Sequence, residues 1–250
     1  MSDTLAALLQ LSHDLGREDR PFAILGEGNT SARLEGGRFA VKASGCSLGS
    51  LAAGDLTVCD QGRLLALFDA EAPDEAGMEA ALLAARVDPA AKRPSIEALF
   101  HAWLLTLDGV GFVGHTHPVA CNQWLCSPRA IELSEQRIFP DEVVCCGPAS
   151  VFVPYSDPGL PLAIAIRERT RAFIEKLGVI PRIILLESHG VIALGSTPQA
   201  VLGAMFMAEK AAAIRLGAAT LGGPIPLRAE QIASLAGRRD EAYRQRQLRM

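Results

Sequence analysis

The chain has 250 residues, 49% of them hydrophobic and 21% charged, a balance that is typical of a folded globular protein and excludes a disordered chain. Its formal net charge of −4 gives no broad cationic surface for nucleic acid, so an anionic ligand requires a local pocket. The length allows one large domain with a substantial core.

Targeting signals and disulfide patterns are not expected in this chain. The N-terminal apolar run is interrupted at His13 and Asp14, and no basic segment precedes it. No apolar stretch approaches the roughly 20 residues of a membrane-spanning helix. The cysteines form no C-x-x-C pair, and two of them, Cys145 and Cys146, are adjacent. We therefore expect a cytoplasmic protein with reduced thiols and no membrane association.

The first third of the chain predicts a helix and two hairpins. Apolar residues at helical spacing predict the helix over 3–16. Short apolar segments alternate with Gly, Asn and Ser over 24–45, which predicts a hairpin followed by a loop. Residues 55–67 predict a second hairpin that turns at Gln61 and Gly62.

The middle of the chain predicts a helix followed by a buried strand. Residues 95–107 carry helical periodicity, with Ser95 placed as the N-cap and Pro94 just before it. The segment GVGFVGHTHP, residues 109–118, is apolar up to its two histidines and predicts a strand. Both histidines are therefore expected near the end of that strand.

The last third predicts long helices around a further buried strand. Residues 160–178 and 198–219 have the helical pattern, and 182–195 predict the strand. Helices and strands alternate without a linker or repeat, which indicates one α/β domain with helices on both faces of a sheet. We expect this domain to occupy 1–250, with a charged helical tail at 228–250.

A pair of histidines separated by one residue is the first candidate for chemistry. On a strand, His115 and His117 project to one side while Thr116 points away. Two imidazoles on one face can chelate a metal such as zinc. The alternative is two unrelated histidines beside a turn.

A third histidine strengthens the metal interpretation. His189 follows the apolar segment IILLE and precedes Gly190, where a small residue lets the backbone turn closely. Three histidines at strand ends, with an open fourth position, suit a catalytic zinc site. Taken alone, His189 is equally consistent with a hydrogen-bonded histidine at a sheet edge.

Glu97 is the candidate for the fourth group, two residues into the helix that is expected to start at Ser95. A carboxylate beside a divalent cation can bind it and then leave to move a proton when substrate arrives. The alternatives are a favourable charge at the positive end of the helix and an i, i+4 contact with His101.

Two polar, glycine-bearing loops are candidates for anion binding. GEGNTS (26–31) and KASG (42–45) expose backbone N–H groups and hydroxyls, and Lys42 adds a positive charge. Ser95 adds a donor at a helix N-terminus. Neither loop is a Walker motif or a G-x-G-x-x-G fingerprint, and each taken separately is equally consistent with a plain hairpin turn.

The order GEGNTS, VKASG, PSIEALFH, GHTHP and ESHG along one chain resembles the class II aldolase/adducin family, whose founding activities are fuculose-phosphate aldolase and ribulose-phosphate 4-epimerase. The resemblance covers a core of about residues 5–220. It implies a three-layer α/β/α sandwich around a mostly antiparallel mixed sheet, assembled as a homotetramer with sites between subunits.

The resemblance also assigns roles to residues. By this resemblance, His115, His117 and His189 match the zinc ligands, and Glu97 matches the acid that ligates the metal and shuttles the proton. The residues that match the phosphate loops are Gly28, Asn29, Ser44, Gly45 and Ser95. The epimerases carry aspartate where this chain has Glu97, yet Lys42 falls where the epimerases have a phosphate-binding lysine. The sequence therefore combines features of both branches.

Two departures from the aldolases concern the phosphate site and a second acid. The aldolases often have Ser-Ser before the acidic residue, and Ile96 replaces the second serine here. Their catalytic tyrosine has no clear match, since the tyrosines are Tyr155 and Tyr243. Asp141 is a candidate second acid/base. The motifs look closest to the aldolase half of fused rhamnulose-phosphate aldolase/dehydrogenase proteins.

The implied activity is cleavage of a ketose, expected to be phosphorylated, by a retro-aldol reaction. Zn²⁺, or another divalent metal such as Co²⁺ or Mn²⁺, would polarise the carbonyl and stabilise the enediolate, while Glu97 moves the proton. The alternatives are a zinc-dependent sugar-phosphate epimerase, a 3-keto sugar acid phosphate decarboxylase, and an adducin-like interaction module without catalysis. A decayed site would be expected to lose ligands, and all four are present, which favours an enzyme.

Overall fold

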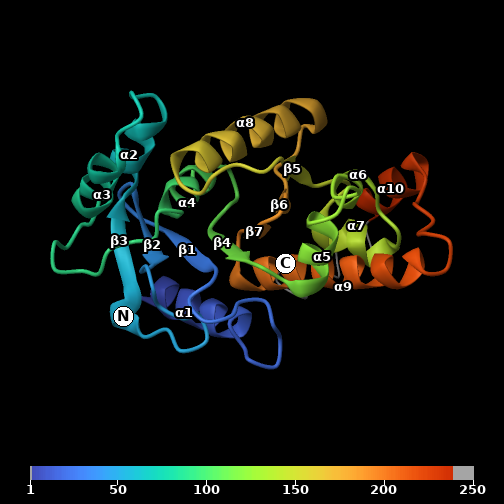
Figure 1. Ribbon diagram of the computed structural model, residues 1–250, viewed down its shortest axis with the longest axis horizontal. Coiled ribbons are helices and arrows are strands. Elements are labelled where there is room, and N and C mark those ends of the chain that lie inside the picture. Colours follow the sequence, from blue (N-terminus) through green and yellow to red (C-terminus); the bar gives the residue numbers. More distant parts are fainter. Residues whose placement is uncertain (1, 239–250) are drawn as a thin grey trace.

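A mixed β-sheet runs through the middle of the molecule (Figure 1). The computed structural model describes residues 2–238, so the predicted tail beyond that point lies outside the described residues. Within this range the strand order is β3-β2-β1-β4-β7-β6-β5, and the neighbouring strands are antiparallel except for the parallel pair β5 and β6. The strands are β1 (Asn29–Leu34), β2 (Arg38–Lys42), β3 (Leu56–Asp60), β4 (Phe112–Thr116), β5 (Val151–Val153), β6 (Ile183–Leu186) and β7 (Gly190–Gly195).

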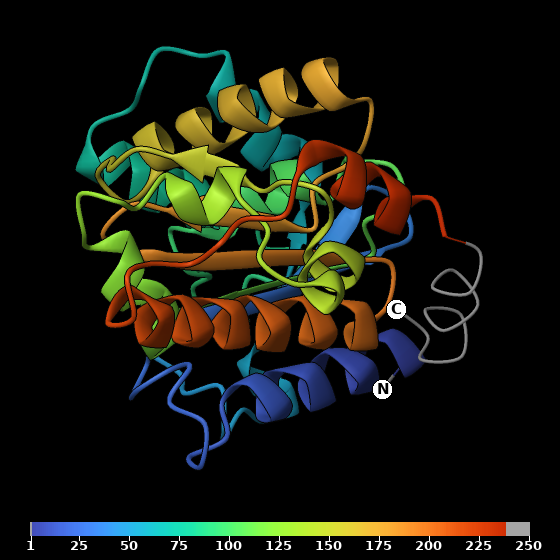
Figure 2. The same cartoon turned by 90° about the vertical axis from the view of Figure 1, so that its right-hand side faces the viewer.

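Helices cover both faces of the sheet, and Figure 2 shows α8 on one side of it and α9 with α1 on the other. The first face carries α2 (Gln61–Leu65), α3 (Glu75–Ala84), α4 (Ala98–Leu104) and α8 (Leu160–Leu177). The second carries α1 (Asp3–Leu15), α5 (Val119–Leu125), α7 (Pro140–Cys146) and α9 (Pro198–Ala219). The predicted α/β/α arrangement is confirmed. The remaining short elements are α6 (Glu132–Glu135), α10 (Ala229–Ala236), η1 (Ala53–Asp55) and η2 (Ala66–Phe68).

The apolar runs in the central strands reflect burial on both faces. In β6, Ile184 and Leu186 belong to the apolar core that also contains residues of α4 and α8, whereas Ile183 and Leu185 belong to the core on the α9 side. Side chains alternate along a strand, so a strand covered on both faces needs apolar residues at every position. No helix within residues 2–238 is long and apolar enough to cross a membrane.

Two predictions that concern strands and their turns are wrong in detail. The second predicted hairpin is instead β3 followed by α2, because the Asp60 carboxylate accepts a hydrogen bond from the backbone N–H of Arg63 at 3.1 Å and caps a helix at the expected turn. The single strand predicted over 182–195 is two antiparallel strands, β6 and β7, joined by a turn at residues 187–189. A period of two cannot reveal a reversal within a fully apolar run.

Candidate metal centre

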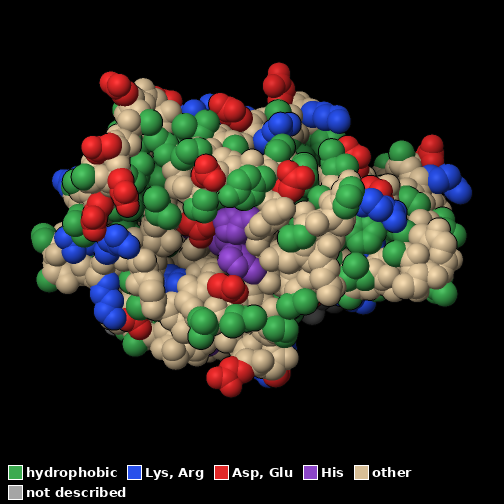
Figure 3. All heavy atoms as spheres, in the orientation of Figure 1, with side chains coloured by type: hydrophobic (Ala, Val, Ile, Leu, Met, Phe, Trp, Pro, Cys, Tyr) green, Lys and Arg blue, Asp and Glu red, His purple; other side chains and the backbone are tan. Residues whose placement is uncertain are grey.

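Three histidine side chains converge at one end of β4. His115 lies in β4, His117 follows the end of that strand, and His189 lies in the turn between β6 and β7. One ring nitrogen of each lies within 4.8 Å of the others, and the Nε2 atoms of His115 and His117 are 3.2 Å apart. Figure 3 shows histidine side chains gathered in the middle of this face, with acidic side chains beside them. The three rings form one cluster, of which strand spacing predicts the pair His115 and His117.

The pairing of β4 with β7 brings the distant histidine to the other two. Thr116 pairs with Val191, which places the turn before β7 beside the end of β4. A Cβ atom on Gly190 would lie 2.6 Å from Cδ2 of His117, so only glycine permits this approach. Thr116 itself points to the opposite face, where its hydroxyl contacts the sulfur of Met205 at 3.3 Å.

The other ring nitrogens of His115 and His117 face acceptors. His115 Nδ1 lies 3.1 Å from the carbonyl oxygen of Val191, which can only accept, so Nδ1 carries the proton. His117 Nδ1 lies 3.6 Å from Oε2 of Glu27, which is held by the backbone N–H of Ile24 at 2.9 Å. Such acceptors orient a metal-binding ring and direct its Nε2 lone pair toward the ion. Nothing in the segment around Glu27 predicts this contact, because only the tertiary structure brings Glu27 to His117.

The electrostatics keep two of the rings neutral. Burial lowers the pKa of His115 well below its usual value, and the neighbouring His117 and His189 lower it further. Burial also lowers the pKa of His189, while the nearby Glu97 opposes that shift. Neutral imidazole is the form that ligates a metal.

Glu97 faces the histidine cluster. Its Oε1 lies 3.4 Å from Nε2 of His189, and its Oε2 lies 3.6 Å from Nε2 of His115. Oε2 also accepts a hydrogen bond from Asn29 Nδ2 at 2.5 Å. The alternative predicted from sequence, a direct side-chain contact with His101, is replaced by an indirect one, because Asn29 lies between the two side chains.

The helix that carries Glu97 begins later than predicted. Glu97 occupies the N-cap position of α4, whereas Ser95 was expected there. The Ser95 hydroxyl instead accepts a hydrogen bond from the backbone N–H of Glu97 at 3.3 Å, which closes a turn before the helix. The Glu97 carboxylate makes no capping hydrogen bond with its own helix and points to the histidines.

The donor set fits a divalent cation of borderline softness, such as zinc. Three imidazole nitrogens converge on one point, and a carboxylate approaches two of them from another side. Three histidines with a further position for a carboxylate, water or substrate are the ligands of a catalytic zinc site. The exposed fractions of the side chains are 0% for His115, 21% for His117 and 19% for His189, so the cluster opens toward solvent on one side.

The two glycine-bearing loops lie beside this cluster. Gly28 has a positive φ of 66°, and a Cβ there would lie 2.6 Å from the carbonyl oxygen of His115. A bridge between Ala43 and Pro94 places the KASG loop beside Ser95, so the loop residues predicted from sequence are neighbours in space. Gly45 also has a positive φ, of 76°.

Lys42 has a different environment from the one the sequence suggests. Its side chain is buried, and Nζ donates to the carbonyl oxygens of Gly26 at 3.0 Å and Cys46 at 2.6 Å. These bonds tie the GEGNTS loop to the segment after KASG. Burial lowers the pKa of Lys42, and the nearby Cys46 and Glu97 oppose that shift.

Ile96 changes the character of the adjoining surface. Its side chain is 38% exposed and lines an apolar cavity of about 430 Å³ together with Met78, Leu160 and Ile164. A Cβ on Gly159 would lie 3.0 Å from Cδ1 of Ile96, so the start of α8 packs closely on this residue. An apolar side chain therefore occupies the position at which the aldolases often have a second serine.

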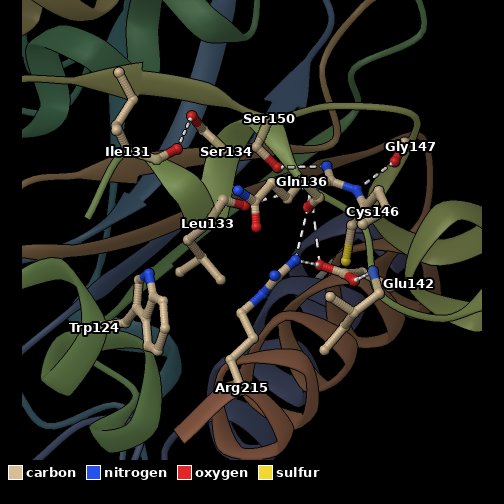
Figure 4. A network of polar contacts seen from close by, with 12 residues as sticks. Trp124, Ile131, Leu133, Ser134, Gln136, Glu142, Cys146, Gly147, Ser150 and Arg215 are labelled. Carbon is tan, nitrogen blue, oxygen red and sulfur yellow. Dashed lines mark hydrogen bonds and ion pairs between the residues drawn. The ribbon is translucent and has the colours of Figure 1, made fainter. Parts of the chain in front are cut away.

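The remaining acid candidate, Asp141, lies in the first turn of α7 beside Glu142. Glu142 belongs to a separate buried network, shown in Figure 4, in which its Oε1 lies 3.0 Å from Arg215 and 3.9 Å from Arg137. All three side chains of this network are almost completely buried. Tyr155 is 60% exposed, and Tyr243 lies outside the described residues.

The fold resembles those of several solved structures. An L-fuculose 1-phosphate aldolase is 18% identical with a TM-score of 0.71, covering 94% of this chain and 95% of that one. YgbL from Escherichia coli, whose assignment spans aldolase, epimerase and decarboxylase, is 21% identical with a TM-score of 0.69, at 93% and 97% coverage. The class II aldolase domain of a conserved protein from Thermoplasma acidophilum is 24% identical with a TM-score of 0.67, at 86% and 94% coverage.

Sequence comparison extends the likeness from fold to family. No curated protein sequence matches the chain. The family model described as "Class II Aldolase and Adducin N-terminal domain" matches residues 6–216, which include the strands of the described sheet and the three clustered histidines. The chain therefore belongs to the class II aldolase and adducin N-terminal domain family.

Proposed function

We propose that this protein is a metal-dependent class II aldolase that cleaves a ketose, in phosphorylated form, by a retro-aldol reaction. The observation that carries the proposal is the convergence of three histidine nitrogens with Glu97 facing two of them. Family membership supports it, because the superfamily comprises aldolases, epimerases and decarboxylases.

In this proposal His115, His117 and His189 hold a zinc ion, or Co²⁺ or Mn²⁺ in its place. When bound, the metal supplies Lewis-acid chemistry that polarises the ketose carbonyl and stabilises negative charge on the substrate oxygens. Glu97 stands 3.4 to 3.6 Å from two ligand nitrogens, which puts its carboxylate within reach of a substrate bound at the same point.

Glu97 is proposed to transfer the proton. Glu97 is ionised in the free protein and takes up a proton from solvent before cleavage. When the C3–C4 bond breaks, the electron pair stays on C3, and that carbon takes up the proton from the Glu97 carboxyl group, which returns to the carboxylate. The C4 hydroxyl loses its own proton to a second acid/base. Asp141, in the first turn of α7, is the candidate from sequence for this second acid/base.

The phosphate of the substrate is proposed to bind the glycine-bearing loops through Gly28, Ser44, Gly45 and Ser95. The resemblance also placed Asn29 there, but both polar atoms of its side-chain amide contact Glu97 and His101 instead. The support is their position next to the cluster, with Gly28 against the backbone of His115. Lys42 contributes positive charge from below these loops. Ile96 removes one donor from this pocket, which is expected to weaken phosphate binding.

Epimerase and decarboxylase chemistry would use the same metal and the same negative charge on the substrate. Glu97 favours the aldolase, because the epimerases that the sequence resembles carry aspartate there. The complete set of ligands favours catalysis over an adducin-like interaction role.

The test is a substrate panel with zinc-loaded protein. Ketose 1-phosphates, ketose 5-phosphates and a 3-keto sugar acid phosphate are each incubated with the chain, and NMR of the products distinguishes cleaved, epimerised and decarboxylated species. We expect aldehyde and dihydroxyacetone phosphate from at least one ketose 1-phosphate, and none with the His117→Ala variant. Epimer or carbon dioxide without cleavage would replace the aldolase by one of the alternatives. No conversion of any member would favour the interaction module.

A further inference from the structure

Three polar side chains connect the interior of the protein to Glu97. Ser31 Oγ lies 2.6 Å from Nδ1 of His101, Nε2 of His101 makes a short contact with Oδ1 of Asn29, and Asn29 Nδ2 donates to Glu97 Oε2 at 2.5 Å. Asn29 and Ser31 project from one face of β1, and Glu97 and His101 lie one turn apart at the start of α4. Ser31 and His101 are completely inaccessible, and Asn29 is 3% exposed.

The donors and acceptors that the four groups offer fix the direction of each hydrogen bond in this network. An ionised Glu97 carboxylate only accepts, so Asn29 must turn its NH₂ group toward Glu97. The Asn29 carbonyl oxygen then faces His101 and requires a donor, so the proton of the ring must be on Nε2. Nδ1 is left as an acceptor, and the Ser31 hydroxyl donates to it.

The environment of His101 supports this tautomer over a charged ring. Burial lowers the pKa of His101 to about 3, the nearby Glu97 carboxylate opposes that shift, and His115 adds to it. The ring also stacks on Phe100, with centroids 4.7 Å apart. A neutral ring with one donor and one acceptor is the form that both of its neighbours require.

We propose that Ser31 and His101 are positioning residues, which hold the Asn29 amide in one orientation so that its N–H fixes the Glu97 carboxylate against the histidine cluster. This inference rests on the proposed function for the role of Glu97. Without the donor on His101, the Asn29 amide could flip and present its oxygen to the carboxylate. The two oxygens would repel, and Glu97 would leave the place from which it reaches the ligands His115 and His189.

The first test needs neither metal nor substrate. Long-range ¹H–¹⁵N correlation spectra of the histidine-labelled chain report which ring nitrogen carries the proton, and the His101→Gln variant identifies the signal of His101. We expect the Nε2–H tautomer at both about pH 5 and about pH 7. A proton on Nδ1 of His101, or a charged His101 ring at about pH 5, would overturn the assigned hydrogen-bond directions, whatever the activity of the protein.

The second test compares two replacements of His101. Gln keeps an N–H near the position of Nε2, whereas Leu fills the space without a donor. We expect His101→Leu to lower kcat at least about tenfold with KM changed less than about threefold and with metal content and Tm near those of the wild type, and His101→Gln to recover most of the loss. Equal kcat for Leu and wild type, or equal losses for Leu and Gln, would overturn the positioning role.

A matched control and a fallback separate this inference from the proposed function. His13 in α1 bonds to the carbonyl oxygen of Leu51, away from the cluster, so His13→Leu should leave kcat unchanged. If wild-type protein cleaves no ketose, the proposed function fails. The tautomer of His101 still shows whether the hydrogen bonds run in the assigned directions. If His101→Leu does not fold, the spectra of the wild type and of Asn29→Ala decide, because removal of the acceptor should change the His101 tautomer.

Discussion

Asn29 in β1 lies directly opposite His115 in β4, as antiparallel partners in the centre of the sheet. The amide of Asn29 and the ring of His115 both approach Oε2 of Glu97, at 2.5 and 3.6 Å. The register of one strand pair therefore sets the spacing between a proposed metal ligand and the donor that holds the carboxylate. Asn29 and His115 are both held by paired strands, and residues on rigid elements keep a more constant geometry than residues on loops.

Metal binding should depend on His117. Protein purified without chelators is expected to contain about one zinc per chain, because the three imidazoles converge on one point. His117→Ala removes one of three nitrogen ligands and should reduce the metal content in elemental analysis to near zero. His13→Ala, in α1, is the control and should keep its metal. Full occupancy in the His117 variant would refute the ligand assignment.

Glu97→Gln should separate structure from chemistry. The amide is nearly isosteric and its oxygen can still accept from Asn29, so the fold and much of the metal affinity are expected to remain. Loss of the acid/base group should lower kcat by roughly 10² to 10⁴. The measurement is turnover at saturating substrate, with metal content determined in parallel, and exposed Glu79→Gln is the control. Undiminished turnover would remove Glu97 from the mechanism.

Lys42→Met should affect substrate binding more than turnover. The variant removes the positive charge that contacts the loops proposed to bind phosphate, and it is expected to raise KM for a phosphorylated ketose at least tenfold, about 1.4 kcal/mol, with a smaller effect on kcat. Inorganic phosphate should inhibit the wild type and lose potency against the variant. Equal binding of phosphorylated and unphosphorylated ketoses to both proteins would show that the loops do not bind phosphate.

The same variant should also be less stable, because the carbonyl oxygens of Gly26 and Cys46 lose their donor. The expected cost is about 1 to 3 kcal/mol in the free energy of unfolding, which urea titration measures. If Lys42→Met were as stable as the wild type but had a raised KM, the Lys42 charge would contribute to substrate binding and not to the stability of the loops.

Acid should destabilise the metal-free protein partly through His101. Its pKa is about 3 in the folded chain and about 6.5 in the unfolded chain, so between these values the unfolded state binds a proton that the folded state does not. Stability from this group therefore falls as the pH is lowered from about 6.5 toward 3, by at most about 1.4 kcal/mol per pH unit. Urea midpoints of the wild type should drop more steeply with acid than those of His101→Gln. If the urea midpoints of the two proteins fell in parallel with pH, the lowered pKa of His101 would be contradicted.

Glu142→Gln should destabilise the fold without touching the site. Glu142 is the acid between the buried guanidinium groups of Arg137 and Arg215, and its removal leaves two buried cations without compensation (Figure 4). The expected loss is about 3 to 5 kcal/mol in the free energy of unfolding. Exposed Glu230→Gln, whose partner Arg228 is 3.9 Å away, should change it by less than about 0.5 kcal/mol. A loss below about 1 kcal/mol for Glu142→Gln would contradict this account.

The sequence predicted the parts of the site that depend on local geometry. The spacing of His115 and His117 on a strand, and the position of His189 after an apolar run, placed the rings at strand ends. The period of apolar residues likewise predicted α9 over Pro198–Ala219. These inferences need only the repeat of one element, which neighbouring residues determine.

The parts that depend on tertiary contacts were not predictable. Glu27 carries no signal in its own segment, because it meets His117 only in the folded chain. The helical spacing of His101 from Glu97 suggested a direct contact, and only the tertiary structure shows that Asn29 lies between them. Lys42 was expected at a ligand, yet two backbone carbonyls from neighbouring loops bind its ammonium group. Asp60 caps a helix where a Gln-Gly turn was expected, because a side-chain acceptor can outweigh turn propensity.

The place of β4 as the middle strand of seven links metal uptake to the order of folding. Two of the histidines come with β4, and the third arrives only when β7 pairs with it, over a long separation in sequence. Closing such distant contacts is slow compared with forming helices or the β1–β2 hairpin. A refolding chain supplied with Co²⁺ should therefore gain its helical circular dichroism before its visible absorption bands, so the colour of the bound ion can time the closure of the central sheet.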